Sequence, residues 1–195
     1  MLYIDENIES ISIEQALEQV SPQRRLVAMR YRREQDRKLS LAVFLLLKRA
    51  LREEYGITEV QPFVFGPNGK PELQGLPGIH FNLSHCAHAA ACVVGDTPVG
   101  VDVESIMPLD DALMARTMSL DEQRLIAAAP HPEVEFTRLW TMKESLLKLI
   151  GEGLTDDLPA VLHDAHLYRF STTIRSRYVC TTCQMASTNQ QLYVK

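Results

Sequence analysis

The stretch VGVDVE, Val99–Glu104, alternates β-branched valines with small or acidic residues. This alternation is typical of a β-strand with one buried face. Side chains two residues apart project from the same face of a strand, so we expect Asp102 and Glu104 side by side. Val101 and Val103 should then face the core. The stretch therefore predicts a strand that carries two neighbouring carboxylates.

A pair of adjacent carboxylates has two physical explanations. The two negative charges repel each other unless a cation lies between them. A hard divalent cation, Mg²⁺ above all, is commonly held by one or two carboxylates together with substrate phosphates. A solvated strand edge that uses charge to prevent aggregation shows the same pattern. An Asp-x-Glu pattern is common, so this stretch alone leaves both interpretations open.

Segments before this strand predict a first unit of helices and strands. Ser21-Pro22 is a good N-cap and first turn, and Gly56 can supply a left-handed C-terminal cap, so one or two helices are expected between them. Their apolar part, LSLAVFLLLKRAL (Leu39–Leu51), should be buried. The next segment, FGPNGKPELQGLPG, predicts turns and extended backbone. IHFNLSH and AHAAACVVG are then typical of strands with short connections.

Segments after this strand predict a second unit. Ser119 and Glu122 form a capping-box pattern at the start of a helix. Another helix is indicated between Pro132 and Gly151, and LHDAHLYRFSTTIRSRYVCTTCQM alternates like strands. The predicted fold class is α+β, with two helix-plus-antiparallel-sheet halves at residues 1–104 and 105–195.

Composition restricts the classes of function. With 195 residues and 46% apolar content, the chain can bury a core as one domain or two packed halves. A net charge of −5 argues against a general nucleic-acid binder, although ten of the twenty Lys and Arg residues lie between Arg24 and Arg52, where an anion could bind. The N-terminal MLYIDENIES lacks the basic region of a signal peptide, and the longest apolar run is too short to cross a bilayer. We therefore expect a cytoplasmic protein without membrane contact.

Cysteine and histidine residues do not suggest a metal or disulfide framework. Four cysteines without an export signal are too few and too unevenly placed for one. The CTTC segment has zinc-knuckle spacing but no second Cys or His pair, so the thiols are interpreted as structural. A zinc site at His80, His85 and His88 is disfavoured, because a neighbouring motif accounts for His85 without zinc.

A line of three residues on the later helix adds weight to the metal interpretation. Trp140, Glu144 and Lys148 fall at i, i+4 and i+8, at the border of the apolar stripe. Glu144 and Lys148 could form an ordinary surface pair contributing about 0.2–0.5 kcal/mol. They could also supply a third acid and a phosphate-binding lysine. Neither helix nor strand decides between these alternatives by itself.

Four motifs together carry a family resemblance. GKP (Gly69–Pro71), FNLSH (Phe81–His85), VGVDVE and FTRLWTMKESLLKLIGEGL (Phe136–Leu154) resemble, in order and spacing, the motifs of the 4′-phosphopantetheinyl transferases. The similarity is to the surfactin-synthetase-activating branch, in which one chain holds two similar halves packed as a pseudo-dimer. It covers roughly residues 21–154.

The resemblance implies an activity and its partners. The family transfers the 4′-phosphopantetheine arm of coenzyme A to a serine of an apo acyl or peptidyl carrier protein, using Mg²⁺, and releases holo carrier protein and 3′,5′-ADP. It also implies a monomer. Carrier proteins are generally acidic, so the docking surface would be local: the Arg24–Arg52 region, or the segment between Met107 and Arg124.

The resemblance also implies roles for individual residues. Asp102, Glu104 and Glu144 would surround the metal, and Lys148 would contact the phosphates. Glu122 would lie near the magnesium or help the serine proton to leave, unless it is only the capping-box acid. The nucleotide end of coenzyme A would be bound by Arg24, Lys70, Ser84 and His85.

Two rival functions come from other classes. A non-catalytic coenzyme A or nucleotide-binding module would keep this fold without transfer, but all three acids and Lys148 are present. A basic-helix nucleic-acid binder would act through Arg24–Lys38, but the negative total charge and the lack of interleaved aromatic residues count against it.

Overall fold

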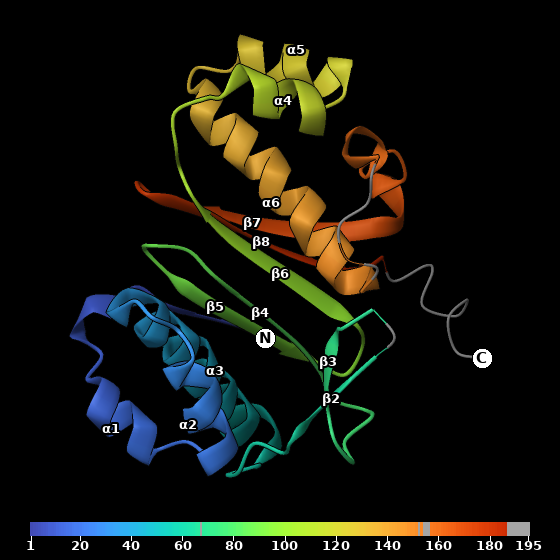
Figure 1. The fold of residues 1–195 in the computed structure, drawn as a ribbon. Coiled ribbons are helices and arrows are strands. Elements are labelled where there is room, and N and C mark those ends of the chain that lie inside the picture. Colours follow the sequence, from blue (N-terminus) through green and yellow to red (C-terminus); the bar gives the residue numbers. More distant parts are fainter. Residues whose placement is uncertain (67, 152, 154–156, 187–195) are drawn as a thin grey trace.

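Two three-stranded antiparallel sheets lie next to each other, each with its own helices on the outer side (Figure 1). The computed structural model describes residues 1–66, 68–151, 153 and 157–186. The first half contains β1 (Leu2–Asp5), the short 3₁₀ helix η1 (Ile8–Ser10), α1 (Ile13–Glu18), α2 (Pro22–Met29), α3 (Glu34–Tyr55), β2 (Phe63–Phe65), β3 (Pro71–Leu73), β4 (His80–His85) and β5 (Ala90–Gly95). The second half contains β6 (Val99–Ser105), α4 (Asp111–Thr117), α5 (Leu120–Ala128), α6 (Pro132–Ile150), the 3₁₀ helices η2 (Leu158–Ala160) and η3 (Ala165–Leu167), β7 (Tyr168–Ile174) and β8 (Tyr178–Met185).

Strand order separates the two halves. The first sheet runs β1-β5-β4 and the second runs β6-β8-β7, while β2 and β3 pair as a separate ribbon. The predicted α+β class is confirmed. Strand β6 pairs with β8, so residues 99–105 lie in the second sheet. A boundary drawn after residue 104 would cut β6 from its own sheet, and the sheets instead divide before Val99.

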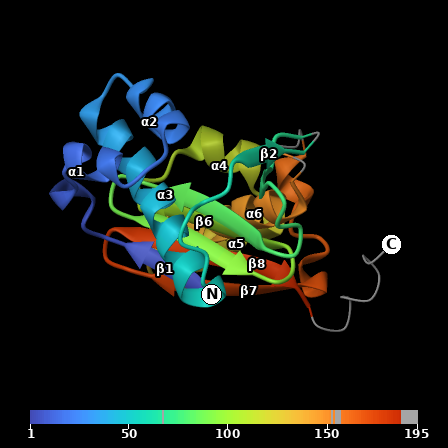
Figure 2. The same ribbon diagram turned by 90° about the horizontal axis from the view of Figure 1, so that it is seen from below.

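Helix α3 is buried nearly all round because it lies between a sheet and two other helices. One side packs on the first sheet through residues such as Ala42 and Leu46. The other side, with Leu41 and Phe44, receives α1 and α2 (Figure 2). The predicted burial is confirmed. Gly56 ends the helix with a φ of 69°, a left-handed conformation that glycine adopts without strain.

Strand β6 presents different residues to its two sides. Val99, Val101 and Val103 are buried against the first sheet, as the alternation predicted. The intervening residues face α6. A Cβ atom on Gly100 would lie 1.9 Å from the carbonyl oxygen of Ser145. Helix α6 can therefore lie this close to β6 only because residue 100 is a glycine. The close contact holds the helix and the acidic face of β6 together.

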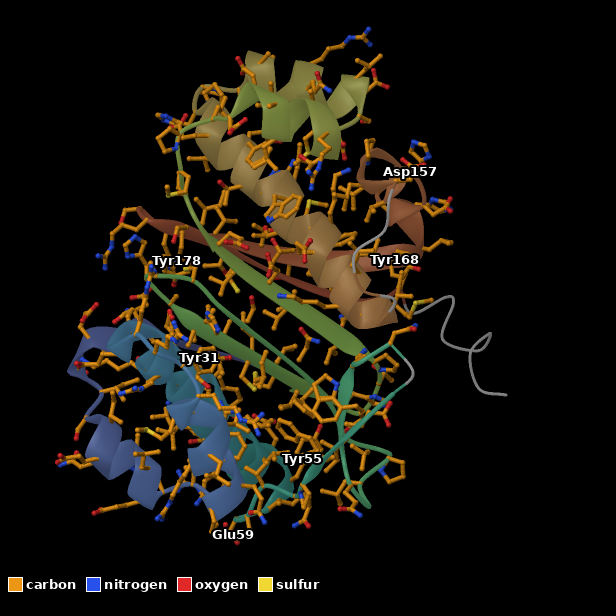
Figure 3. The ribbon with its side chains drawn as sticks, in the orientation of Figure 1. Tyr31, Tyr55, Glu59, Asp157, Tyr168 and Tyr178 are labelled. Carbon is orange, nitrogen blue, oxygen red and sulfur yellow. The ribbon has the colours of Figure 1, made fainter. Side chains whose placement is uncertain are left out.

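The two sheets are joined at β4 and β6 by side chains. Asn82 Oδ1 accepts a hydrogen bond from the Val101 amide at 3.2 Å, and Ser84 Oγ accepts one from Val103 at the same distance. Asn82 and Ser84 are two residues apart, as are the two valines, so both contacts form on matching faces. Further along β6, Tyr178 (labelled in Figure 3), which pairs with Ser105, donates its hydroxyl proton to Glu6. These contacts fix one half against the other.

Several local predictions are confirmed, whereas the 3₁₀ helices η1, η2 and η3 and some further elements were not predicted. The α5 capping box, both long helices and the strands β4 to β8 are present as expected. All four cysteines are free and buried. The elements β1, α1 and α4 were not predicted. Within the described part of the chain, no helix is both long and apolar enough to cross a membrane. Residues 187–195 and 154 lie outside the described residues.

Candidate active site

A buried cluster of polar contacts forms where β4, β6 and α6 meet. Lys148 Nζ lies 2.6 Å from Asp102 Oδ1 and donates a hydrogen bond to Ser84 Oγ at 3.0 Å. Ser84 Oγ in turn donates to Asp102 Oδ1 at 2.9 Å. Asp102 is 2% exposed, so its charge depends on these partners. The structure thus brings together three of the predicted site residues.

Two further acids complete the negative side of the cluster. Burial and the nearby charge of Asp102 raise the pKa of Glu104 to about 7, against the opposing effects of Lys148 and of a hydrogen bond from Trp140. Burial and Asp102 also raise the pKa of Glu144, while Lys148 opposes the shift. Each of the two glutamates therefore responds to the charge of Asp102, as expected for carboxylates that share one region.

The chemistry of these acids fits a hard cation. In the described part of the chain, Asp102 Oδ2 and Glu144 Oε1 are buried without a hydrogen-bond partner. Unpaired carboxylate oxygens are the ligands that Mg²⁺ accepts. In residues 1–66, 68–151, 153 and 157–186, however, no three His, Cys, Asp or Glu side chains are grouped closely enough to hold a metal as they stand. The donors are present, and the Lys148 ammonium already pairs with one Asp102 oxygen.

A cavity of about 340 Å³ opens beside the cluster. Its walls come from the Asn68–Pro71 turn, from β4, from α6 and from the glycines that come after α6. Glu144 and Lys148 both line it. A larger cavity of about 620 Å³ lies between β1, α3 and the β7–β8 turn, and its lining includes none of the predicted site residues. The smaller cavity is therefore the better candidate for a substrate.

The predicted nucleotide-binding residues differ in their positions. His85 ends β4 directly after Ser84 and is exposed. Lys70 lines the 340 Å³ cavity, but its Nζ donates to the Leu149 carbonyl at 2.6 Å, at the end of α6. Arg24 points into the first half, where its guanidinium donates to Ser40 and lies over the Phe44 ring. As placed, Lys70 and Arg24 stabilise the protein, and their role in binding stays a prediction.

Glu122 lies in the first turn of α5 and contacts α6 through Lys143. Its Oε2 accepts a hydrogen bond from the Ser119 amide at 2.7 Å and lies 2.9 Å from Lys143 Nζ. The capping box offered as the alternative is confirmed. The structure does not place Glu122 in contact with Asp102, Glu144 or Lys148, so a role at the metal or the serine stays a prediction without structural support.

Comparison with known proteins identifies the family. The sequence profile of the 4′-phosphopantetheinyl transferase superfamily matches residues 98–191. A 4′-phosphopantetheinyl transferase of Bacillus subtilis is 30% identical over 159 residues, which cover 79% of this chain and 70% of the relative. The chain belongs to the 4′-phosphopantetheinyl transferase superfamily. It is also 36% identical over 155 residues to the Bacillus pumilus transferase psf-1, covering 78% of this chain and 66% of the relative.

Membership in the 4′-phosphopantetheinyl transferase superfamily gives the activity class. The chain is an enzyme that transfers the phosphopantetheine group to carrier proteins, with coenzyme A as the donor. The resemblance noted from the four motifs is confirmed. The cluster of Ser84, Asp102 and Lys148 lies within those motifs, and it is the candidate site of this transferase.

Sequence reasoning assigned no role to three residues of the strands and helix that carry this candidate site. Asn82 anchors β6 through Val101, and Trp140 donates a hydrogen bond to Glu104. Lys143 is fully buried on α6. Its burial could have been predicted, because Leu139 and Leu146 flank it at i−4 and i+3 and define a buried face. Its partner Glu122 gave no such signal, since the pairing depends on how α5 packs on α6.

Proposed function

We propose that this chain catalyses attack of a carrier-protein serine hydroxyl on the β-phosphate of coenzyme A, through the cluster of Asp102, Glu104, Glu144 and Lys148. The new bond joins the serine oxygen to phosphorus. The bond to the leaving 3′,5′-ADP breaks, and the serine proton passes to Glu144 directly or through a water. One observation carries the proposal. The ion pair of Lys148 with Asp102 lies beside a cavity that Lys148 and Glu144 line.

The polar side chains of the site suit these roles. Lys148 carries a positive charge next to the cavity and can shift from Asp102 to a phosphate oxygen over a short distance. The raised pKa of Glu144 makes it a stronger base than a solvated glutamate. Ser84 positions the side chains of Asp102 and Lys148 next to each other, because its hydroxyl group forms a hydrogen bond with both. Positioning and electrostatics would supply most of the rate enhancement.

We assign Asp102, Glu104 and Glu144 as the residues that would hold Mg²⁺. The ion would neutralise charge on the pyrophosphate of coenzyme A. The unpaired oxygens of Asp102 and Glu144 support this assignment. Ser84 and His85, at the end of β4, are proposed to contact the nucleotide end, together with Lys70, which lines the cavity.

The test is mass spectrometry of an apo acyl carrier protein after incubation with the enzyme, coenzyme A and Mg²⁺. A mass gain of about 340 Da, lost in EDTA, is the expected result for phosphoryl transfer of the arm. The Glu144→Ala variant should fold normally and give no gain. Tight coenzyme A binding without a mass shift on several carriers would instead support the non-catalytic module.

The setting of the reaction is part of the same proposal. We expect a monomer that acts in the cytoplasm on a soluble carrier protein. The pairing of the two sheets through Asn82 and Ser84 supports a monomer, since both halves of the site come from one chain. Gel filtration with in-line light scattering measures the mass directly, and a dimer at micromolar concentration would contradict this expectation.

A further inference from the structure

Lys143 carries a buried charge that the proposed chemistry does not use. It is the largest of the fully buried side chains in the described part of the protein, with 0% exposure. Its Nζ lies 2.9 Å from Glu122 Oε2 and donates to the carbonyls of Leu158 and Pro159 at 2.9 and 3.3 Å. A buried ammonium group is costly unless it is paired and hydrogen-bonded. These contacts therefore specify one arrangement of the elements that meet there.

Three elements meet at the Lys143 ammonium. The lysine belongs to α6, Glu122 belongs to the first turn of α5, and Leu158 and Pro159 belong to η2. Glu122 also accepts the Ser119 amide, so the start of α5 is fixed at the same point. Figure 3 shows Asp157, the residue before η2, beside α6. Lys143 thus connects both α5 and η2 to α6, the helix that carries Glu144 and Lys148.

The other face of α6 carries the reactive groups. Glu144 comes directly after Lys143 in sequence, and consecutive helical side chains point about 100° apart. Lys143 therefore faces α5 and η2, while Glu144 and Lys148 line the 340 Å³ cavity. Gly151 and Gly153, just after α6, line the same cavity. Gly151 lies in the cavity wall at the end of α6. Further along the chain, the Leu158 carbonyl accepts a hydrogen bond from Lys143 and so contacts α6 again.

We propose that Glu122 and Lys143 are positioning residues that set α6 and the wall after it, so that Glu144 and Lys148 face the bound donor. Glu122 then acts through Lys143 and touches neither the cation nor the serine. This inference rests on the proposed function, because it concerns the geometry of that same site.

A double-mutant cycle tests the inference. The variants are Glu122→Gln, which keeps an acceptor for the Ser119 amide, Lys143→Met, which keeps a long unbranched side chain without the charge, and the double variant. Each single substitution is expected to lower kcat per folded molecule about tenfold, and the double variant should be no worse than the poorer single. The Mg²⁺ concentration for half-maximal rate should stay within about twofold of wild type in Glu122→Gln.

A matched control lies on the same helix as Lys143. Glu135 and Arg138 form a pair within α6 at 2.6 Å. Glu135→Gln, Arg138→Met and their double variant should retain the wild-type kcat per folded molecule, because a pair within one helix holds no second element in place. Circular dichroism at the assay temperature reports the folded fraction of every variant.

Four outcomes would overturn the inference. Wild-type kcat per folded molecule in both single variants would reduce the pair to a role in stability. Losses that multiply in the double variant, or a raised Mg²⁺ requirement in Glu122→Gln, would place Glu122 at the reacting groups. Calorimetry measures the coenzyme A affinity of the same four proteins and needs no transfer reaction. Additive effects of the two substitutions on that affinity would also refute the inference. A wild-type enzyme that modifies no carrier contradicts the proposed function instead.

Discussion

Lys148 Nζ lies 2.6 Å from Oδ1 of Asp102, while Oδ2 of the same carboxylate is buried without a hydrogen-bond partner among the described residues. The ammonium group thus neutralises one side of a buried acid and leaves the other side available to a cation. Binding of a pyrophosphate would offer Lys148 a second anionic partner. We expect this lysine to be needed both for the resting site and for the reaction.

Lys148→Met should lower kcat/KM for carrier modification about 10²–10³-fold, because it removes a positive charge from the place where phosphate charge develops. Quantitative mass spectrometry of carrier modification measures the rate. Arg177→Met is the control, since Arg177 is an exposed cation in the turn between β7 and β8. Wild-type kcat/KM in Lys148→Met would remove this lysine from the mechanism.

Stability of the metal-free protein should depend on pH through Glu104. Burial, with the charge of Asp102, raises the pKa of this carboxyl from 4.5 to about 7, so the folded protein favours the protonated form. The resulting stabilisation is fully present below pH 4.5 and is lost as the pH rises through about 7. Urea unfolding in EDTA, at pH values from about 5 to about 8, should show a falling free energy of unfolding that Glu104→Gln flattens.

The control for this pH dependence is Glu59→Gln, because Glu59 is a largely exposed acid with a side-chain accessibility of 80%. Its pH profile should match that of the wild type. A Glu104→Gln protein with an unchanged profile would show that Glu104 titrates normally in the folded state.

Gly100→Ala should destabilise the protein, because its Cβ would lie 1.9 Å from the Ser145 carbonyl oxygen and 2.8 Å from the Leu149 nitrogen. Helix α6 would have to move away from β6, and we expect a loss of about 3 kcal/mol or more in the free energy of unfolding. Gly78→Ala is a matched control, since a Cβ there meets no atom within 4 Å. Equal urea midpoints for the two variants would contradict the close contact.

Arg32→Glu together with Arg33→Glu should weaken carrier docking more than coenzyme A binding. Both side chains are exposed in the turn between α2 and α3, next to Tyr31, which is also exposed (Figure 3). Reversed charge should repel an acidic carrier and raise its KM about tenfold, with the KM for coenzyme A within about twofold of wild type. Arg177→Glu, exposed at the β7–β8 turn, is the control. An unchanged carrier KM would leave the Met107–Arg124 segment as the docking surface.

Periodicity predicted the elements that build the site. The alternation in Val99–Glu104 placed the acids on one face of a strand, and capping signals located α5 and α6. Elements such as β1 were missed because it has only four residues, all half-buried, and gains its stability from pairing with β5. Such pairing is a tertiary effect that local propensity does not contain.

Contacts between distant segments could not be predicted from spacing. Arg24 lies in a basic stretch and was assigned to the nucleotide, yet it packs on Phe44 and Ser40 because α2 crosses α3 at that point. Glu122 had two interpretations in the sequence, and its contact with Lys143 depends on helix packing. Residue type indicated which groups can do chemistry, while the fold determined which of them meet.

The side-chain joint between β4 and β6 has a consequence for dynamics. The amide protons of Val101 and Val103 are bonded to Asn82 and Ser84, which belong to the other sheet. Their rates of exchange with deuterated solvent should therefore depend on separation of the two halves, whereas amides paired within β6 and β8 depend on unfolding of that sheet. A higher protection of these two protons with coenzyme A bound would show that the donor holds the two halves together.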